Sequence, residues 1–113
     1  MGLRPHSEAL HVVVSGSASP LAAVSAVAGQ RVTVYRVIVS VASAVNVTFQ
    51  DTGAGALSSA LQFVGTTLQP LVIGDANNGD PLWQTGVGLG LQVALSGAVQ
   101  TNVDIWYTQE VAF

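Results

Sequence analysis

The side chains best suited to binding a metal ion lie in one short stretch, residues 74–80. Asp75, Asn77 and Asp80 would offer hard oxygen ligands of the kind that calcium prefers. The spacing departs from the EF-hand pattern, because the glycine falls one place early and Gly86 stands where a bidentate glutamate is needed. Asx side chains that hydrogen-bond to their own backbone explain the same composition. We therefore expect a turn here and no metal site.

Side chains that could catalyse hydrolysis are present, but their order does not resemble an active site. A nucleophilic triad needs a serine, a histidine and an acid, and the only histidines, His6 and His11, lie near the N-terminus. No GxSxG motif occurs. Paired carboxylates for glycoside hydrolysis could be drawn from four aspartates, of which all but the last lie in predicted loops: Asp51, Asp75, Asp80 and Asp104. We predict that the protein is not an enzyme and that it holds no cofactor.

The two tryptophans are the remaining candidates for a binding site. Either ring could stack on the apolar side of a pyranose, and Trp106 shares its predicted strand face with polar residues that a glycan site requires, Asn102, Asp104 and Thr108. The alternative is that Trp106 packs under a neighbouring subunit or loop and that Trp83 closes the end of the fold. We favour packing, and glycan binding stays open as the alternative.

Charge is scarce along the whole chain. Only 8% of the 113 residues are charged and none is lysine, whereas about 25% is typical of globular domains. Because the cores of protein interfaces are depleted in charged residues, we predict that copies of this chain cover part of one another's surface. The chain also lacks cysteine, which excludes disulfides and thiolate metal sites.

The same composition excludes two classes of partner. The net charge of −3 and the lack of a basic cluster argue against nucleic acid. Arg31 and Arg36 have opposite parity along one predicted strand, so alternation places them on opposite faces. No apolar run approaches the roughly 20 residues of a membrane-spanning helix. We expect binding to neither nucleic acid nor membrane.

Two stretches with alternating apolar residues predict the elements that position these side chains. In residues 89–96 and 99–107, apolar side chains occupy every second position, which is typical of half-buried antiparallel strands. The intervening Ser96-Gly97 favours a tight turn, so we predict a β-hairpin. Residues 31–41 are rich in β-branched side chains at nearly every position, as expected of a strand that is covered on both faces. Residues 44–50 alternate, and the turn at Ser43-Ala44 joins the two strands in a second predicted hairpin.

Shorter strands are expected at residues 11–15, 57–64 and 66–73. A turn and a further short strand are expected at residues 16–29. Pro70 marks a strand edge or bulge. Strands every eight to twelve residues with glycine-rich turns predict an all-β fold, a single-domain antiparallel β-sandwich or jelly roll of about eight strands. We assign residues 1–10 to a flexible N-terminal arm and residues 11–113 to the sandwich.

One longer pattern resembles a known group of proteins. It reads Trp83-x-Thr85-x-x-Gly88-x-Gly90-Leu91-x-Val93-x-Leu95-Ser96-Gly97-Ala98, followed by Val99, Val103 and Tyr107. Upstream, VYRVIVSVASAVNVTFQD and the turn at Gly55-Ala56-Leu57 also match. Over roughly residues 30–108 the sequence resembles small proteins of tailed bacteriophages whose genes often lie near that of the major capsid protein.

Members of such groups that act as head decoration (cement) proteins are compact β-sandwiches, usually trimeric, at local three-fold positions of the shell. The resemblance implies a structural virion protein that is made in the bacterial cytoplasm, binds the outside of the head and stabilises the capsid. Its expected partners are the major capsid protein and itself, as a homotrimer. We expect the interface residues to include Trp83, Trp106, Tyr107 and Arg36. The alternative is a virion fibre, tail or lectin-like module that uses Trp106 and the Asp75–Asp80 loop to hold host surface glycans.

Overall fold

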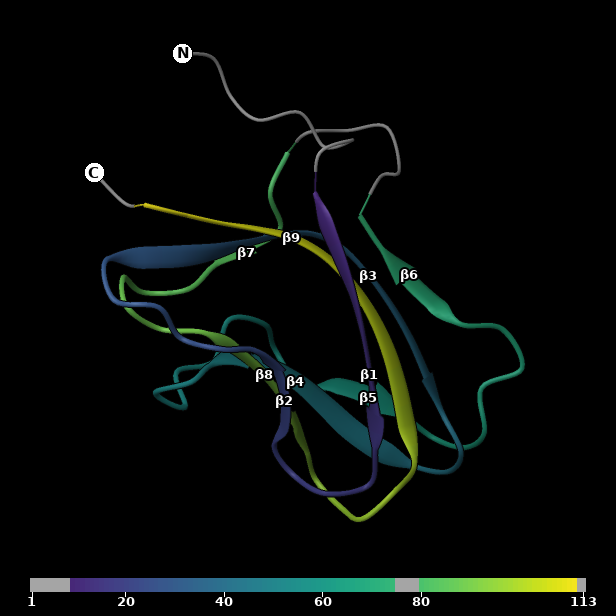
Figure 1. The fold of residues 1–113 in the computed structure, drawn as a ribbon. Coiled ribbons are helices and arrows are strands. Elements are labelled where there is room, and N and C mark those ends of the chain that lie inside the picture. The colour runs from purple at the N-terminus through teal and green to yellow at the C-terminus, as the bar shows by residue number, and fades with distance from the viewer. Residues whose placement is uncertain (1–8, 75–79, 112–113) are drawn as a thin grey trace.

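The computed structural model describes residues 9–74 and 80–111, and these form an all-β domain of two antiparallel sheets (Figure 1). One sheet has the order β1-β9-β3-β6, with β7 also paired to β3, and the other has the order β2-β8-β4-β5. The predicted β-sandwich is confirmed. The first sheet consists of β1 (Leu10–Gly16), β9 (Thr101–Val111), β3 (Gln30–Val41), β6 (Leu71–Ile73) and β7 (Trp83–Gln84). The second consists of β2 (Leu21–Val24), β8 (Leu91–Leu95), β4 (Val45–Asp51) and β5 (Leu61–Phe63).

The strands pair in a nested order. β1 pairs with β9, β2 with β8, β3 with β6 and β4 with β5. Apart from the two-residue β7, the first strand therefore lies beside the last, the second beside the last but one, and so on inward. The same nested pairing is found in a jelly roll, in which a long antiparallel pair of strands folds over into two sheets.

Both predicted hairpins are wrong, although their strands exist. β3 and β4 belong to different sheets, and so do β8 and β9. Each connection passes from one sheet to the other, and the two meet where the amide of Ala42 donates a hydrogen bond to the carbonyl of Gln100 at 3.0 Å. Alternation reports which face of a strand is buried, but both sheets bury a face in the same core, so the pattern does not identify the strand's partner.

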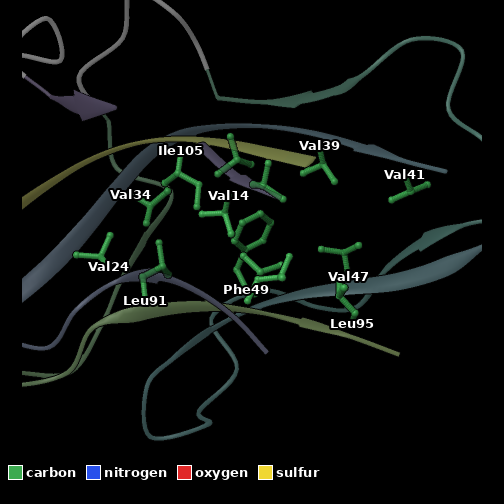
Figure 2. Packing of buried hydrophobic residues seen from close by; sticks show 14 of the residues in the cluster. Val14, Val24, Val34, Val39, Val41, Val47, Phe49, Leu91, Leu95 and Ile105 are labelled. Atoms are coloured by element: carbon green, nitrogen blue, oxygen red, sulfur yellow. The ribbon is translucent and has the colours of Figure 1, made fainter. Parts of the chain in front are cut away.

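The core lies between the two sheets and is almost entirely aliphatic. The fully buried side chains come from alternating positions of the four long inner strands, and they include Val37, Val39, Val47, Phe49, Leu91, Val93, Val103 and Ile105. Figure 2 shows Phe49 in the middle of this layer, with Ile105 and Val39 towards one sheet and Leu91 and Leu95 towards the other. Burial of each such side chain contributes about 1.5–3 kcal/mol, so this layer holds the two sheets together.

Some predicted boundaries change. β5 and β6 span three residues each, less than the strands predicted at residues 57–64 and 66–73. Pro70 directly precedes the edge strand β6, a place where its missing N–H does not interrupt a ladder. β1 begins at Leu10, the last residue of the predicted arm, and residues 1–8 of that arm lie outside the described part of the chain.

The loop between β7 and β8 is fastened to β3 by Thr85, a side chain that is almost completely buried. The Thr85 hydroxyl accepts a hydrogen bond from the amide of Val32 at 2.9 Å, and it lies 3.0 Å from the carbonyl oxygen of Leu89. The Thr85 amide donates to the Val32 carbonyl, also at 2.9 Å. One threonine thus satisfies backbone groups that would otherwise be buried without partners.

Candidate interaction surface

The outer face of the five-stranded sheet collects the aromatic and charged side chains that the sequence singled out. Residues that are opposite in register on neighbouring strands share a face of the sheet. One row across β1, β9 and β3 contains His11, Trp106 and Arg36. The adjacent row, which extends to β6, contains Val13, Asp104, Ile38 and Val72. We call His11, Trp106, Arg36, Asp104 and Ile38 the Trp106 face, and Val13 and Val72 lie at its two margins.

The indole of Trp106 is covered on both sides by its neighbours. The imidazole of His11 stacks on it with ring centroids 4.4 Å apart and planes 12° from parallel. The Arg36 guanidinium carbon lies 5.1 Å from the indole centroid, within cation–π range. Because β1 and β3 flank β9 on opposite sides, His11 and Arg36 cover opposite faces of the ring. Only the edge of the indole is left for an external partner.

Asp104 joins the two rows. Its carboxylate lies 3.0 Å from Nε2 of His11, and both side chains are partly exposed. The contact is diagonal across β1 and β9, since His11 is opposite Trp106 and Asp104 is opposite Val13. Asp104 therefore holds the imidazole that stacks on Trp106, and the cluster is ordered before any partner binds.

A bulge in β3 brings Arg36 to this face. The register with β9 shifts between Val34 and Arg36, so that Tyr35 is an additional residue. With regular alternation Arg31 and Arg36 would lie on opposite faces, as the sequence predicts. After the shift both are opposite outward-facing residues of β9, so they share the outer face and that prediction is wrong.

The other two predicted interface residues, Trp83 and Tyr107, lie on the inner face of the same sheet. They flank Val34 in a row that crosses four strands and contains Leu10, Tyr107, Val34 and Trp83. Trp83 stacks on Phe49 of the opposite sheet, with ring centroids 5.0 Å apart. Both are partly buried against the core. Within this single chain, Trp83 and Tyr107 serve packing, whereas Arg36 and Trp106 form an outward cluster.

The carboxylates that were considered for chemistry are separated in the fold. Oδ1 of Asp51 accepts hydrogen bonds from the amides of Gly53 and Gly55, each at 2.9 Å, and so caps a turn. Asp104 pairs with His11, and Asp80 is exposed. His6, Asp75 and Asn77 lie outside the described residues. Within residues 9–74 and 80–111, no group of three or more histidine, cysteine, aspartate or glutamate side chains could hold a metal ion.

The second sheet presents a different outer face. Its outward positions on the central strands are amides, hydroxyls and alanine: Asn46, Thr48, Gln50, Gln92 and Ala94. The side-chain amide of Gln92 donates a hydrogen bond from Nε2 to Oε1 of Gln50 at 2.7 Å. This neutral face carries neither an aromatic nor a charged side chain at those positions, which makes it a natural control for tests of the Trp106 face.

Sequence reasoning missed two features. His11 was weighed only as a catalytic histidine, yet it stacks on Trp106. The aliphatic side chains of Val64 and Leu68 are 97% exposed, although their stretch was predicted to be strand. For Val64 and Leu68 the sequence did contain a signal, since no charged residue occurs between Asp51 and Asp75.

Fold and surface together define a jelly-roll domain with an ordered aromatic cluster on one sheet. Jelly rolls occur in viral capsid proteins, lectins and cupins. The described residues form no helix that is long and apolar enough to span a membrane. Comparisons with protein-family models, with curated proteins and with solved structures found no significant match. Because one fold hosts many functions, function must be argued from the surface.

Proposed function

We propose that this protein is a structural virion protein that binds the outside of a tailed-phage head and stabilises the capsid, as a homotrimer at three-fold positions. The resemblance over residues 30–108 supports this proposal, as does the scarcity of charge along the chain. A jelly roll is compatible with it, since the fold is common among viral shell proteins.

The observation that carries the proposal is the Trp106 face. Tryptophan and arginine are the residues most enriched among those that dominate binding energy at protein interfaces. Here the Arg36 guanidinium lies over the Trp106 indole at the centre of a sheet face, with Asp104 and Ile38 in the adjacent row. An ordered cluster loses little conformational entropy when a partner covers it. We assign the contact with the major capsid protein to this face.

Stabilisation of a shell requires no catalysis and no covalent bond. A protein that binds the assembled shell but not its dissociated subunits shifts the equilibrium towards assembly by mass action. At a concentration of 100 times Kd, each occupied site contributes about 2.7 kcal/mol. A trimer with three such faces also gains from multivalency, because binding of the second and third faces is intramolecular.

The geometry disfavours the glycan-binding alternative. A sugar that stacks on tryptophan needs a free ring face, and both faces of Trp106 are covered, by His11 and by Arg36. Trp83 stacks on Phe49 and is partly buried. The 75–79 segment, which that alternative also used, lies outside the described residues.

Binding of the purified protein to undecorated shells of the matching phage tests the proposal. We expect saturation at a simple ratio to the major capsid protein, and an increase in the temperature at which shells disassemble. Trp106→Ala should weaken binding about 30-fold, as expected for an interface residue worth about 2 kcal/mol. Gln92→Ala, on the neutral face of the other sheet, should leave binding unchanged.

Two results would overturn the proposal. One is the absence of binding to shells by folded wild-type protein. The other is a copy number in purified virions of only a few chains, measured by quantitative mass spectrometry against the major capsid protein, which would place the protein at a portal, tail or fibre. Signal on a glycan array that Trp106→Ala abolishes would instead support the host-recognition alternative.

A further inference from the structure

A second surface, which begins at the Val72 margin of the Trp106 face, lies along one side of the sandwich. β6 is the edge of the first sheet and β5 is the edge of the second. Residues 64–70 connect them and lie at the right of Figure 1. We call β5, β6 and this connection the β5–β6 edge. It carries two side chains that are 97% exposed, Val64 and Leu68, and next to them the exposed Leu71 and Val72.

The connection is held in place by the end of β3 and by the turn that follows it. The amide of Thr67 donates a hydrogen bond to the carbonyl of Val41 at 3.1 Å, and the Thr67 hydroxyl accepts one from the amide of Val41 at 3.1 Å. The hydroxyl of Thr66 donates to the carbonyl of Ala42. Because these bonds fix the middle of the connection, Val64 and Leu68 are presented on either side of an anchored point.

The β5–β6 edge is free of charge, because no charged residue occurs between Asp51 and Asp75. A charged partner surface would lose hydration there without gaining a counter-charge. The chemistry that fits is therefore another neutral, aliphatic surface. Exposed apolar side chains that gather in one patch mark interaction sites in soluble proteins, and the four exposed aliphatic residues of this edge fall within residues 64–72.

The opposite side of the same molecule provides such a surface. β1 and β2 are the edges at the far side of the two sheets, and within the described residues each pairs with one strand only. We call them the β1–β2 edge. β1 exposes Leu10 (57%) and Val13 (61%), and neither strand contains lysine, arginine, aspartate or glutamate. Edge strands are usually protected by charge, lysine above all, and this chain has no lysine.

We infer that the β5–β6 edge of one copy of this chain packs on the β1–β2 edge of the next copy. The two edges match in lacking charge and in exposing branched aliphatic side chains. Since they lie on opposite sides of one protomer, each protomer uses both, and the contact is head-to-tail. A contact of this kind closes into a ring where successive copies are related by a closing rotation, and the homotrimer of the proposed function requires a three-fold one. This inference rests on the self-association included in the proposed function, and it holds for the free protein whether or not a shell is bound.

Cross-linking tests the arrangement directly, because the chain contains no cysteine. Leu68→Cys and Val13→Cys are prepared as single variants, mixed, and treated with a short bismaleimide. We expect covalent dimers from the mixture and none from either variant alone. Ala98→Cys, in the exposed connection between β8 and β9, replaces Val13→Cys in the control mixture and should give none. Dimers from Leu68→Cys alone would show a symmetric contact and overturn the head-to-tail inference.

Light scattering coupled to size exclusion gives the second test. The wild-type chain should elute as one closed oligomer, and the double variant Val64→Ser/Leu68→Ser as a monomer with unchanged circular dichroism. Val87→Ser removes an exposed valine from the loop before β8 and should leave the oligomer intact. A monomeric wild-type chain, or a double variant that stays oligomeric, would overturn the inference.

The result of these tests does not depend on whether the protein binds shells. A ring that forms but does not bind shells would refute the proposed function and leave the head-to-tail contact standing. A monomer that saturates shells would support the capsid partner and refute the contact.

Discussion

The imidazole of His11 and the indole of Trp106 lie nearly parallel, with centroids 4.4 Å apart, on neighbouring strands of the first sheet. β1 is the edge of this sheet, so in the described part of the chain its backbone ladder has a partner on one side only. Stacked aromatic pairs contribute about 0.5–1.5 kcal/mol beyond the area that they bury. The stack therefore ties the first strand to the last one more firmly than the ladder alone.

Removal of the imidazole should loosen β1. We expect His11→Ser to lower the free energy of unfolding by about 1 kcal/mol and to speed hydrogen exchange at the β1 amides more than at those of β3. Ser15→Ala, on the same strand and face, is the matched control and should change neither quantity. Equal acceleration in β1 and β3 would mean that His11 acts on global stability and not on the attachment of the edge strand.

The contact between Arg36 and Trp106 can be measured as a coupling energy. A double-mutant cycle with Arg36→Leu and Trp106→Leu isolates the pair from the loss of each side chain. At this partly exposed site we expect about 0.5–1 kcal/mol of favourable coupling from urea unfolding. The matched cycle uses Gln50→Leu and Gln92→Leu on the other sheet, where a neutral hydrogen bond replaces the cation–π contact. No coupling between Arg36 and Trp106 would remove the argument that their cluster is ordered in advance.

The strands could be predicted from the sequence, but their partners could not. Val45, Val47 and Phe49 are buried as alternation requires, and so are Leu91, Val93 and Leu95. In this fold, however, β3 and β4 lie in opposite sheets, as do β8 and β9, and many of the pairings that form join residues far apart in the chain, such as Leu10 with Tyr107. A turn of small residues between two alternating segments is compatible with a hairpin and with a crossover, so local patterns do not distinguish them.

Only part of the candidate surface follows from the sequence. Arg36 and Trp106 were expected at an interface and lie together on the outer face, but alternation placed Arg36 on the face opposite to Arg31, and the register places both arginines on one face. The single extra residue, Tyr35, reverses parity downstream. A bulge of this kind depends on packing from elsewhere. Here Gly74 lies against the Tyr35 carbonyl and has a φ of 103°, a conformation that side chains disfavour.

Thr85 should be essential to the attachment of the loop before β8. Thr85→Val keeps the volume but removes the hydroxyl that accepts a hydrogen bond from Val32 at a buried site. An unsatisfied buried amide costs about 1–3 kcal/mol, and we expect urea unfolding to show a loss of that size. Thr48→Val, on the outward face of β4, is the matched substitution and should cost less than about 0.5 kcal/mol. Equal effects of the two variants would contradict the role assigned to the Thr85 hydroxyl.

We expect that Gly90 tolerates no side chain. The neighbouring backbone leaves no space for a Cβ there, whereas the backbone conformation of Gly90 itself does not require glycine. A Cβ at this position would collide with the carbonyl oxygen of Val24 and would lie 2.7 Å from the amide nitrogen of Ala26. The glycine cannot easily move away, because its amide donates to the Thr52 hydroxyl at 2.9 Å and its carbonyl accepts from the Thr52 amide at 3.0 Å. We expect Gly90→Ala to lower the free energy of unfolding by about 3 kcal/mol, which corresponds to a fall in Tm of about 10 °C for a domain of this size.

Gly97→Ala is the control for this substitution. A Cβ at Gly97 meets no atom within 4 Å, so this variant should leave Tm within about 2 °C of the wild type. A Gly90→Ala protein that melts with the wild type would show that β2 and the start of β8 do not approach as closely as the fold requires.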